Sequence, residues 1–161
     1  MPTNIDRFNV LVAQILALLY REFPIRQSIR AENLLGYQQT DNTYSPEGRW
    51  TAEYRKGDGT LIRDATADFD FVQDTIRWLS DEGYILHWPY ETGYEFMGVT
   101  LSAKGLELLK AVPSSVAGST SVGDTLLAIF KDGTKDGAKE AAASAISSAL
   151  TQAPGFLMSL R

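Results

Sequence analysis

The side chains of this sequence that could do chemistry are few. His87 is the only histidine of the 161 residues, and the chain contains no cysteine. Zinc sites need several histidine, cysteine or carboxylate ligands, and a catalytic nucleophile needs a base that a third group orients. The spacing in this sequence assembles no such set. We therefore expect neither a metal nor another cofactor, and no enzyme activity.

Two other features have the residue types of a chemical site. Asp68, Asp70 and Asp74 could form an acid–base pair or hold a divalent cation, but their spacing suits the first turns of a helix, where acids complement the helix dipole. The run Lys56-Gly57-Asp58-Gly59-Thr60 has glycines and a lysine, as phosphate-binding loops do. It lacks the flanking strand and helix of such a loop. We interpret both features as structural.

Composition and charge narrow the function classes. With 44% apolar residues, the chain is able to bury the core of one domain plus an appendage. Its formal net charge is −5, and the excess acid lies in residues 1–113. Because nucleic-acid binding neutralises phosphates, this charge disfavours a nucleic-acid partner unless basic residues are concentrated locally. No apolar run is long enough to span a membrane and the first residues do not resemble a signal peptide, so we expect a cytoplasmic protein.

Two helices are predicted near the start of the chain. In residues 5–23, apolar side chains recur every three or four residues, which predicts one amphipathic helix. Pro24 ends it. Residues 28–35 predict a second, short helix that Gly36 terminates.

An unusually long insertion follows at residues 37–65. Residues 49–55 and 60–63 have strand-like composition, and the glycine-rich turn between them is able to close a hairpin. An insertion of this length between helices is often functional.

The third helix is predicted from Thr66 or Asp68, either of which can cap it, to about Glu82. Gly83 then supplies a left-handed C-cap. The apolar side chains at helical spacing predict its buried face, which consists of Phe69, Val72, Ile76 and Leu79.

Two strands and a further helix complete the first part of the chain. Residues 84–88 and 94–101 predict strands around a turn. Ser102 is placed to cap a helix over residues 103–112. Partly buried positions are expected in this helix at Leu106, Leu108 and Leu109.

The end of the chain differs in composition from the rest. Residues 114–121 are small, polar and uncharged, which is typical of a linker. We therefore expect a domain over residues 1–113, and a helical association tail over residues 122–161 whose helix extends to about residue 151.

The order of these elements resembles that of the winged helix-turn-helix superfamily, as in bacterial winged-helix regulators. The likeness is carried by Trp78-Leu79-Ser80-Asp81-Glu82-Gly83-Tyr84-Ile85 and by Val99-Thr100-Leu101-Ser102-Ala103-Lys104-Gly105. It implies a mainly α fold with a small β wing, here with an inserted hairpin and an Ala/Gly-rich helical tail. In that family the third helix enters the DNA major groove.

Both surfaces that contact DNA in the family are acidic in this sequence. The exposed face of the third helix carries Asp70, Asp74, Arg77 and Asp81, and the wing carries Glu91 and Glu95. Carboxylates beside phosphates repel. We therefore favour a non-enzymatic protein–protein interaction module, such as an adaptor, an inhibitor or immunity-type binder, or an oligomeric scaffold. These six residues would form its contact surface.

A DNA-binding transcriptional regulator is the alternative. The insertion interleaves basic and aromatic side chains, which suits contact with a nucleic-acid backbone or a stacked base. A solvated hairpin whose cations balance nearby acids is the competing interpretation. The candidate contact residues are Arg49, Trp50, Arg55, Lys56 and Arg63.

The tail contains a column of small residues spaced four apart. On a helix such a column forms a ridge that lets a second helix approach closely. The ridge could pack on its own domain, pair with a second copy as a homodimer or larger assembly, or touch a membrane surface or another protein. Evenly alternating Lys and Asp disfavours the membrane. The ridge consists of Gly133, Gly137, Ala141, Ala145 and Ala149.

Overall fold

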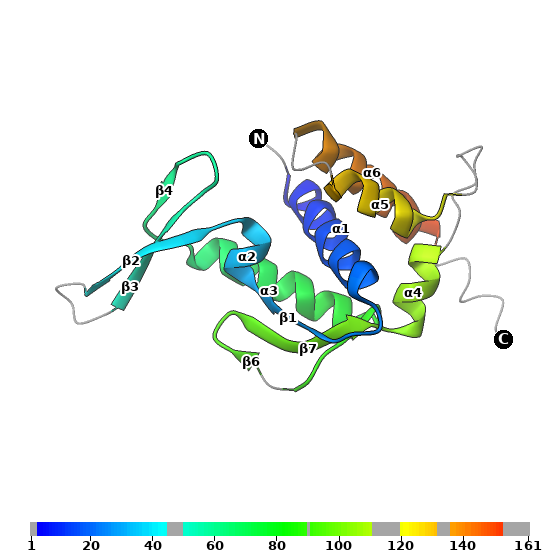
Figure 1. Cartoon of the computed structure of the whole chain (residues 1–161), viewed down its shortest axis with the longest axis horizontal. Coiled ribbons are helices and arrows are strands. Elements are labelled where there is room, and N and C mark those ends of the chain that lie inside the picture. Colours follow the sequence, from blue (N-terminus) through cyan, green and yellow to red (C-terminus); the bar gives the residue numbers. More distant parts are fainter. Residues whose placement is uncertain (1–2, 45–49, 90, 111–119, 132–135, 153–161) are drawn as a thin grey trace.

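The computed structural model describes residues 3–44, 50–89, 91–110, 120–131 and 136–152, and these residues form helices together with two small antiparallel sheets. In chain order the elements are α1 (Asn4–Glu22), β1 (Gln27–Arg30), α2 (Ala31–Leu35), β2 (Gln38–Tyr44), β3 (Trp50–Arg55), β4 (Leu61–Ile62), α3 (Thr66–Asp81), β5 (Ile85–Leu86), β6 (Glu91–Thr92), β7 (Glu95–Leu101), α4 (Ala103–Lys110), α5 (Val122–Lys131) and α6 (Asp136–Gln152) (Figure 1).

Helix α1 lies at the centre of the fold, between α2 and α3 on one side and α5 and α6 on the other (Figure 1). Its start is a capping box: the backbone N–H of Asp6 donates to the Thr3 hydroxyl, and the backbone N–H of Thr3 donates to the Asp6 carboxylate. The predicted helix over residues 5–23 is confirmed. More of it is buried than one stripe, because Ala13, Leu16 and Ala17 are also enclosed.

The helix predicted over residues 28–35 is wrong in its first half. Strand β1 occupies Gln27–Arg30 and pairs antiparallel with β7, with Ile29 opposite Phe96. Only the second half is the helix α2, which ends at Gly36 with a φ of 68° as expected. The physical reason is the partner: β7 is far away in sequence, and its backbone hydrogen bonds override local helix propensity.

The insertion is larger than the predicted hairpin. Strands β3 and β4 do pair around the expected turn, with Tyr54 opposite Ile62. The strand β2 was not expected, and it pairs with β3 to make a three-stranded sheet in the order β2-β3-β4. This sheet projects from one end of the molecule (Figure 1).

Helix α3 buries the predicted face of Phe69, Val72, Ile76 and Leu79. It begins one position earlier than a Thr66 cap requires, because Thr66 is itself the first helical residue. The N-cap residue is Ala65, which makes no side-chain capping bond, so neither Thr66 nor Asp68 is the cap.

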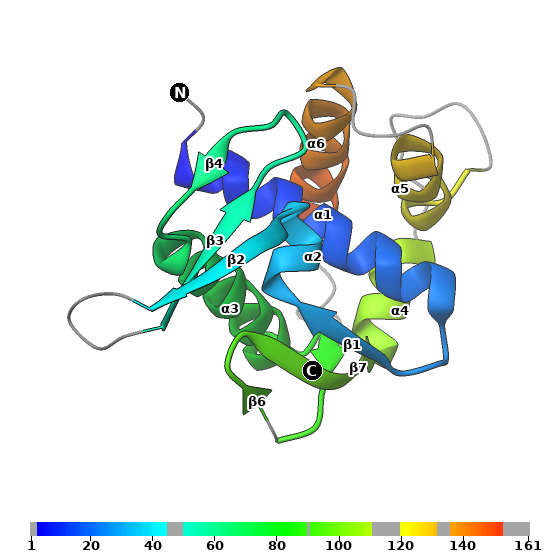
Figure 2. The same cartoon turned by 60° about the vertical axis from the view of Figure 1, so that its left-hand side comes forward.

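The second sheet has the order β1-β7-β5, and β6 also pairs with β7. Gly83 joins α3 to β5 with a φ of 75°, as its predicted left-handed cap requires. The predicted strands flanking the turn are confirmed, although β5 covers only Ile85–Leu86. The sheet lies beneath α1 and α3 in Figure 2.

Ser102 caps α4 as predicted, because its hydroxyl oxygen accepts the backbone N–H of Gly105 at 3.0 Å. Leu108 and Leu109 are buried more deeply than expected. Gly105 is required here by close approach, since a Cβ at this position would overlap the carbonyl oxygen of Tyr84.

The described part of the tail contains two helices, α5 and α6, and both pack on α1. Four of their side chains belong to the same buried core as α1: Val122, Leu126, Ala142 and Ile146. The predicted linker over residues 114–121 lies mostly outside the described residues, and a second copy of the chain remains one of the alternative partners predicted for the tail. Within the described part of the chain, no helix is long and apolar enough to cross a membrane.

Candidate functional site

The exposed face of α3 carries the charges that the sequence predicts. Asp70, Asp74, Arg77 and Asp81 are all exposed. Arg77 lies 3.7 Å from Asp74 one turn away, and the Tyr94 hydroxyl donates to Asp70 at 3.2 Å. Arg77 is the one basic residue of α3, so this face remains acidic.

Glu95 of β7, one of the two acids predicted for the contact surface beside α3, is partly used inside the fold. Glu95 accepts a hydrogen bond from the Ser28 hydroxyl and one from Arg30 Nε at 3.0 Å. These bonds, that from Ser28 first, hold the pKa of Glu95 below its ordinary value and help to fasten β1 to β7. Glu91 lies in β6, and its side chain is outside the described residues.

Asp68 is bound into a network. Arg7 Nη2 donates to one carboxylate oxygen at 2.9 Å, and the Tyr37 hydroxyl donates to the other at 2.5 Å. Burial, followed by this hydrogen bond, raises the pKa of Tyr37. Asp68 therefore joins α1, α3 and the start of the insertion. Among the described residues, no cluster of three His, Cys, Asp or Glu could hold a metal ion.

The insertion is attached to the body by aromatic rings. Tyr54 of β3 meets Phe69 of α3 edge-on, with ring centroids 5.0 Å apart. Phe69 also contacts Tyr94, which lies between β6 and β7, at 5.1 Å and Tyr37 at 6.0 Å. Such contacts hold one face of the inserted sheet against α3.

The basic residues of the insertion are only partly described. Arg55 donates to the Gly59 carbonyl at 2.9 Å, the Lys56 ammonium lies 5.3 Å from the Tyr37 ring centre, and Arg63 is exposed. Arg49 lies outside the described residues. Trp50 is in β3, but its side chain is not described. Trp50 and Arg55 lie in β3, and Lys56 and Arg63 directly follow β3 and β4, so the structure places four of the five candidates in or next to one small sheet.

The small-residue ridge of the tail lies beside the buried face of α6 rather than on it. Ala142 and Ile146 are fully buried, whereas Ala145 and Ala149 are half-buried and Ala141 is exposed. The two glycines of the ridge fall outside what can be placed: Gly133 is not described, and Gly137 is described only as backbone in α6.

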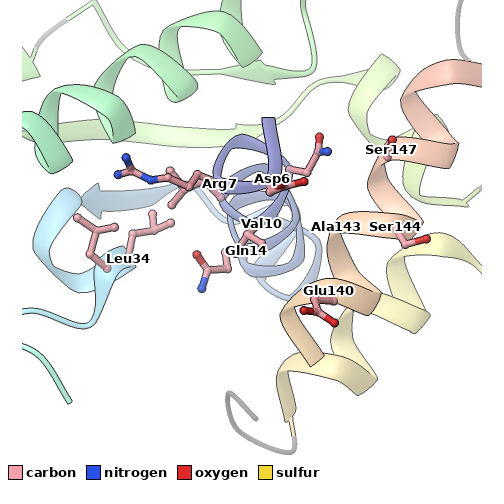
Figure 3. A pocket seen from close by; sticks show the side chains of 12 residues that line it. Asp6, Arg7, Val10, Gln14, Leu34, Glu140, Ala143, Ser144 and Ser147 are labelled. Carbon is pink, nitrogen blue, oxygen red and sulfur yellow. The ribbon is translucent and has the colours of Figure 1, made fainter. Parts of the chain in front are cut away.

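A hollow of about 910 Å³ lies along α1, between α2 and α6. Figure 3 shows Val10 and Gln14 of α1 facing it, Leu34 of α2 on one side, and Glu140 and Ala143 of α6 on the other. The sequence did not predict this hollow. The only indication in the sequence is that apolar residues cover a wide face of α1, which is typical of a helix with packing partners on two sides.

A second hollow of about 470 Å³ continues the first toward the end of α1. Gln14 and Leu34 line both. Further apolar lining comes from Leu18 and from Leu127 and Phe130 of α5. We call the two hollows together the α1 groove.

The two halves of the α1 groove differ in charge. Asp6 and Glu140 line the first hollow, where Arg7 is already paired with Asp68. Arg21 and Lys131 line the second. Hydrogen bonds from Thr3 lower the pKa of Asp6, so its carboxylate is charged at neutral pH. The groove is therefore acidic at one end and basic at the other.

His87 is held in a structural setting. Its Nδ1 lies 2.6 Å from the Trp88 carbonyl oxygen, and its ring meets Phe96 edge-on at 5.5 Å. Comparisons of the chain with family models, with curated proteins and with solved structures find no match.

Proposed function

We propose that this chain is a non-enzymatic protein-binding module on a winged-helix scaffold, acting in the cytoplasm. The element order supports the scaffold: α1, β1, α2, α3, β5 and β7 occur in this order, interrupted by the inserted strands β2–β4 and by β6, and β1 and β5 lie on either side of β7. In a winged helix, α3 would be the helix that meets a binding partner.

The observation that carries the choice of partner is the charge of α3. Asp70, Asp74 and Asp81 are exposed on the side that would face a DNA groove, with Arg77 as the only cation of the helix. Much of the affinity for DNA comes from cations that neutralise phosphates, and carboxylates placed there repel them. A basic or polar protein surface complements this face better.

A charge reversal on α3 tests this proposal. Asp74→Lys should abolish or weaken the co-purification of a partner with the tagged chain from the cells that express it. The matched control is Glu107→Lys, an exposed helical carboxylate on α4. If both variants retain the same bound proteins as the wild type, α3 is not the contact surface.

The DNA-binding alternative is favoured by the position of Arg55, Lys56 and Arg63 at the ends of the neighbouring strands β3 and β4. Fluorescence anisotropy with duplex DNA at about 50 mM and about 200 mM salt separates the two functions. Our proposal expects no binding at either concentration. Binding that falls steeply with salt, and is lost when these three residues become alanine, would establish the alternative instead.

A further inference from the structure

We propose that the α1 groove binds an amphipathic helix of a partner protein, with basic residues of that helix beside Asp6 and Glu140 and acidic residues beside Arg21 and Lys131. This inference rests on the proposed protein-binding function and names a second contact surface and the kind of segment it takes.

The groove offers apolar surface that the described chain leaves uncovered. Leu18, Leu34, Leu127 and Phe130 are only half-buried, and all four line the second hollow. Protein interiors are otherwise packed nearly without voids. Covering these side chains with apolar groups removes them from water, which favours association.

The walls of the groove determine the shape of the occupant. All of the lining comes from α1, α2, α5 and α6 and their immediate ends. Backbone groups within helices are already hydrogen-bonded to one another, so the described residues that line the groove offer no free strand edge to an extended peptide. A helix satisfies its own backbone and presents one apolar ridge, and it therefore fits walls of this kind.

The length of the groove matches a short helix. Asp6 and Arg21 mark its two ends on α1, and at about 1.5 Å per residue they lie about 22 Å apart along the helix axis. A partner helix of about four turns spans this distance. Its apolar side chains would recur at three- and four-residue spacing to meet Val10, Leu34 and Leu127.

Charge determines the direction of the occupant. Arg7 is the one cation among the described residues that line the first hollow, and its charge is balanced by Asp68 at 2.9 Å. The carboxylates of Asp6 and Glu140 therefore make this hollow acidic. Arg21 and Lys131 are the cations of the second, although Arg21 also contacts Glu22 at 2.7 Å. A helix with lysines at one end and glutamates at the other would be attracted in one orientation and repelled in the reverse one.

Two synthetic helical peptides of about four turns test the proposal. Each carries leucines on one face, and the two differ only in their end charges: one peptide has lysines at its first turn and glutamates at its last, and the other has the charges exchanged. Binding to the full chain is measured by isothermal titration calorimetry and by NMR shift perturbation. We expect at least one peptide to bind with shifts centred on α1 and α2. The absence of binding at about 1 mM of both, or shifts confined to other elements, would overturn the proposal.

Variants of exposed rim residues identify the orientation without endangering the fold. Glu140→Lys should lower the affinity for the peptide that wild type prefers about fivefold, because that peptide places lysines beside position 140. The same variant should raise the affinity for the peptide that carries glutamates there. The control Glu107→Lys, outside the groove, should change neither affinity. Equal affinities in Glu140→Lys and wild type would refute the charge assignment and with it the proposal.

A second copy of this chain is the competing occupant. Light scattering at tens of micromolar should show a monomer, and a dimer that Glu140→Lys dissociates would make the chain its own partner and overturn the proposal. Failure of peptide binding with Asp74-dependent co-purification intact would remove the groove and leave the proposed function standing. If instead a peptide binds the groove but Asp74→Lys does not change the co-purified proteins, the contact surface on α3 is wrong and the groove stands.

Discussion

Replacing Ile146 with alanine tests whether the tail helices belong to the same folded unit as α1. Ile146 of α6 is fully buried, and it belongs to the core that also contains Leu16 and Leu126. The substitution removes about three methylene-sized groups, or about 2.4 kcal/mol of transfer free energy at about 0.8 kcal/mol each. The cavity adds to this loss, so the free energy of unfolding should fall by about 3 to 4 kcal/mol.

The same chemical change at Ile5 is the matched control. Ile5 is 67% exposed at the start of α1, and Ile5→Ala should alter the free energy of unfolding by less than about 0.5 kcal/mol. Urea denaturation followed by circular dichroism measures both variants, and a chain of this size should lose about 10 °C in thermal midpoint with Ile146→Ala.

The result that would refute the reasoning is a small effect. If Ile146→Ala unfolds at the same urea concentration as Ile5→Ala and the wild type, α6 does not stabilise α1. A separate early transition, with the rest of the chain unfolding unchanged, would show instead that the tail folds as its own unit.

Three further predictions concern individual contacts. Gly105→Ala should destabilise the chain by about 1 to 3 kcal/mol because the added Cβ would overlap the carbonyl oxygen of Tyr84. In thermal melts the control Gly57→Ala should not show this loss, since a Cβ there has no atom within 4 Å. The pKa of Glu95 is lowered from 4.5, so its contribution to stability is present above that pH and is lost as the pH falls through the lowered value. The difference in melting temperature between wild type and Glu95→Gln should accordingly shrink between neutral and acidic pH, and a constant difference would contradict this. Tyr37→Phe removes the hydroxyl that donates to Asp68 and should cost about 1 to 3 kcal/mol in urea denaturation; an unchanged midpoint would show that this hydrogen bond contributes nothing.

The elements that the sequence predicted correctly are those with a strong local signal. The four apolar residues from Phe69 to Leu79 lie at helical spacing, and they form the buried face of α3. Gly83 and Ser102 occupy positions where local backbone chemistry favours one residue type, a left-handed cap and a helix N-cap. Local signals of this kind do not depend on the rest of the fold.

Strand β1 could not be predicted in this way. Its four residues are too few to show a reliable alternation, and the local pattern continued into that of α2. What makes Gln27–Arg30 a strand is its antiparallel pairing with β7, and Arg30 meets Glu95 across 65 residues of sequence. Pairing at such separation is a property of the tertiary structure.

The candidate contact surfaces were predictable to different degrees. Helical spacing alone placed Asp70, Asp74 and Asp81 on one exposed face, because residues three and four apart share a side of a helix. The ion pair of Glu95 with Arg30 and its hydrogen bond from Ser28 were not predictable, since Glu95 lies in β7 and the other two residues lie in β1.

The sequence by itself determined the helices with clear periodicity, the caps and turns that separate them, and the acidic charge on α3. Only the tertiary structure decided that α5 and α6 fold back on α1, and this docking creates the α1 groove. The physical reason is that periodicity shows which side of a helix is apolar but not which element covers it. Ala13 and Leu16 are buried and Leu34 stays half-exposed because of where distant helices pack.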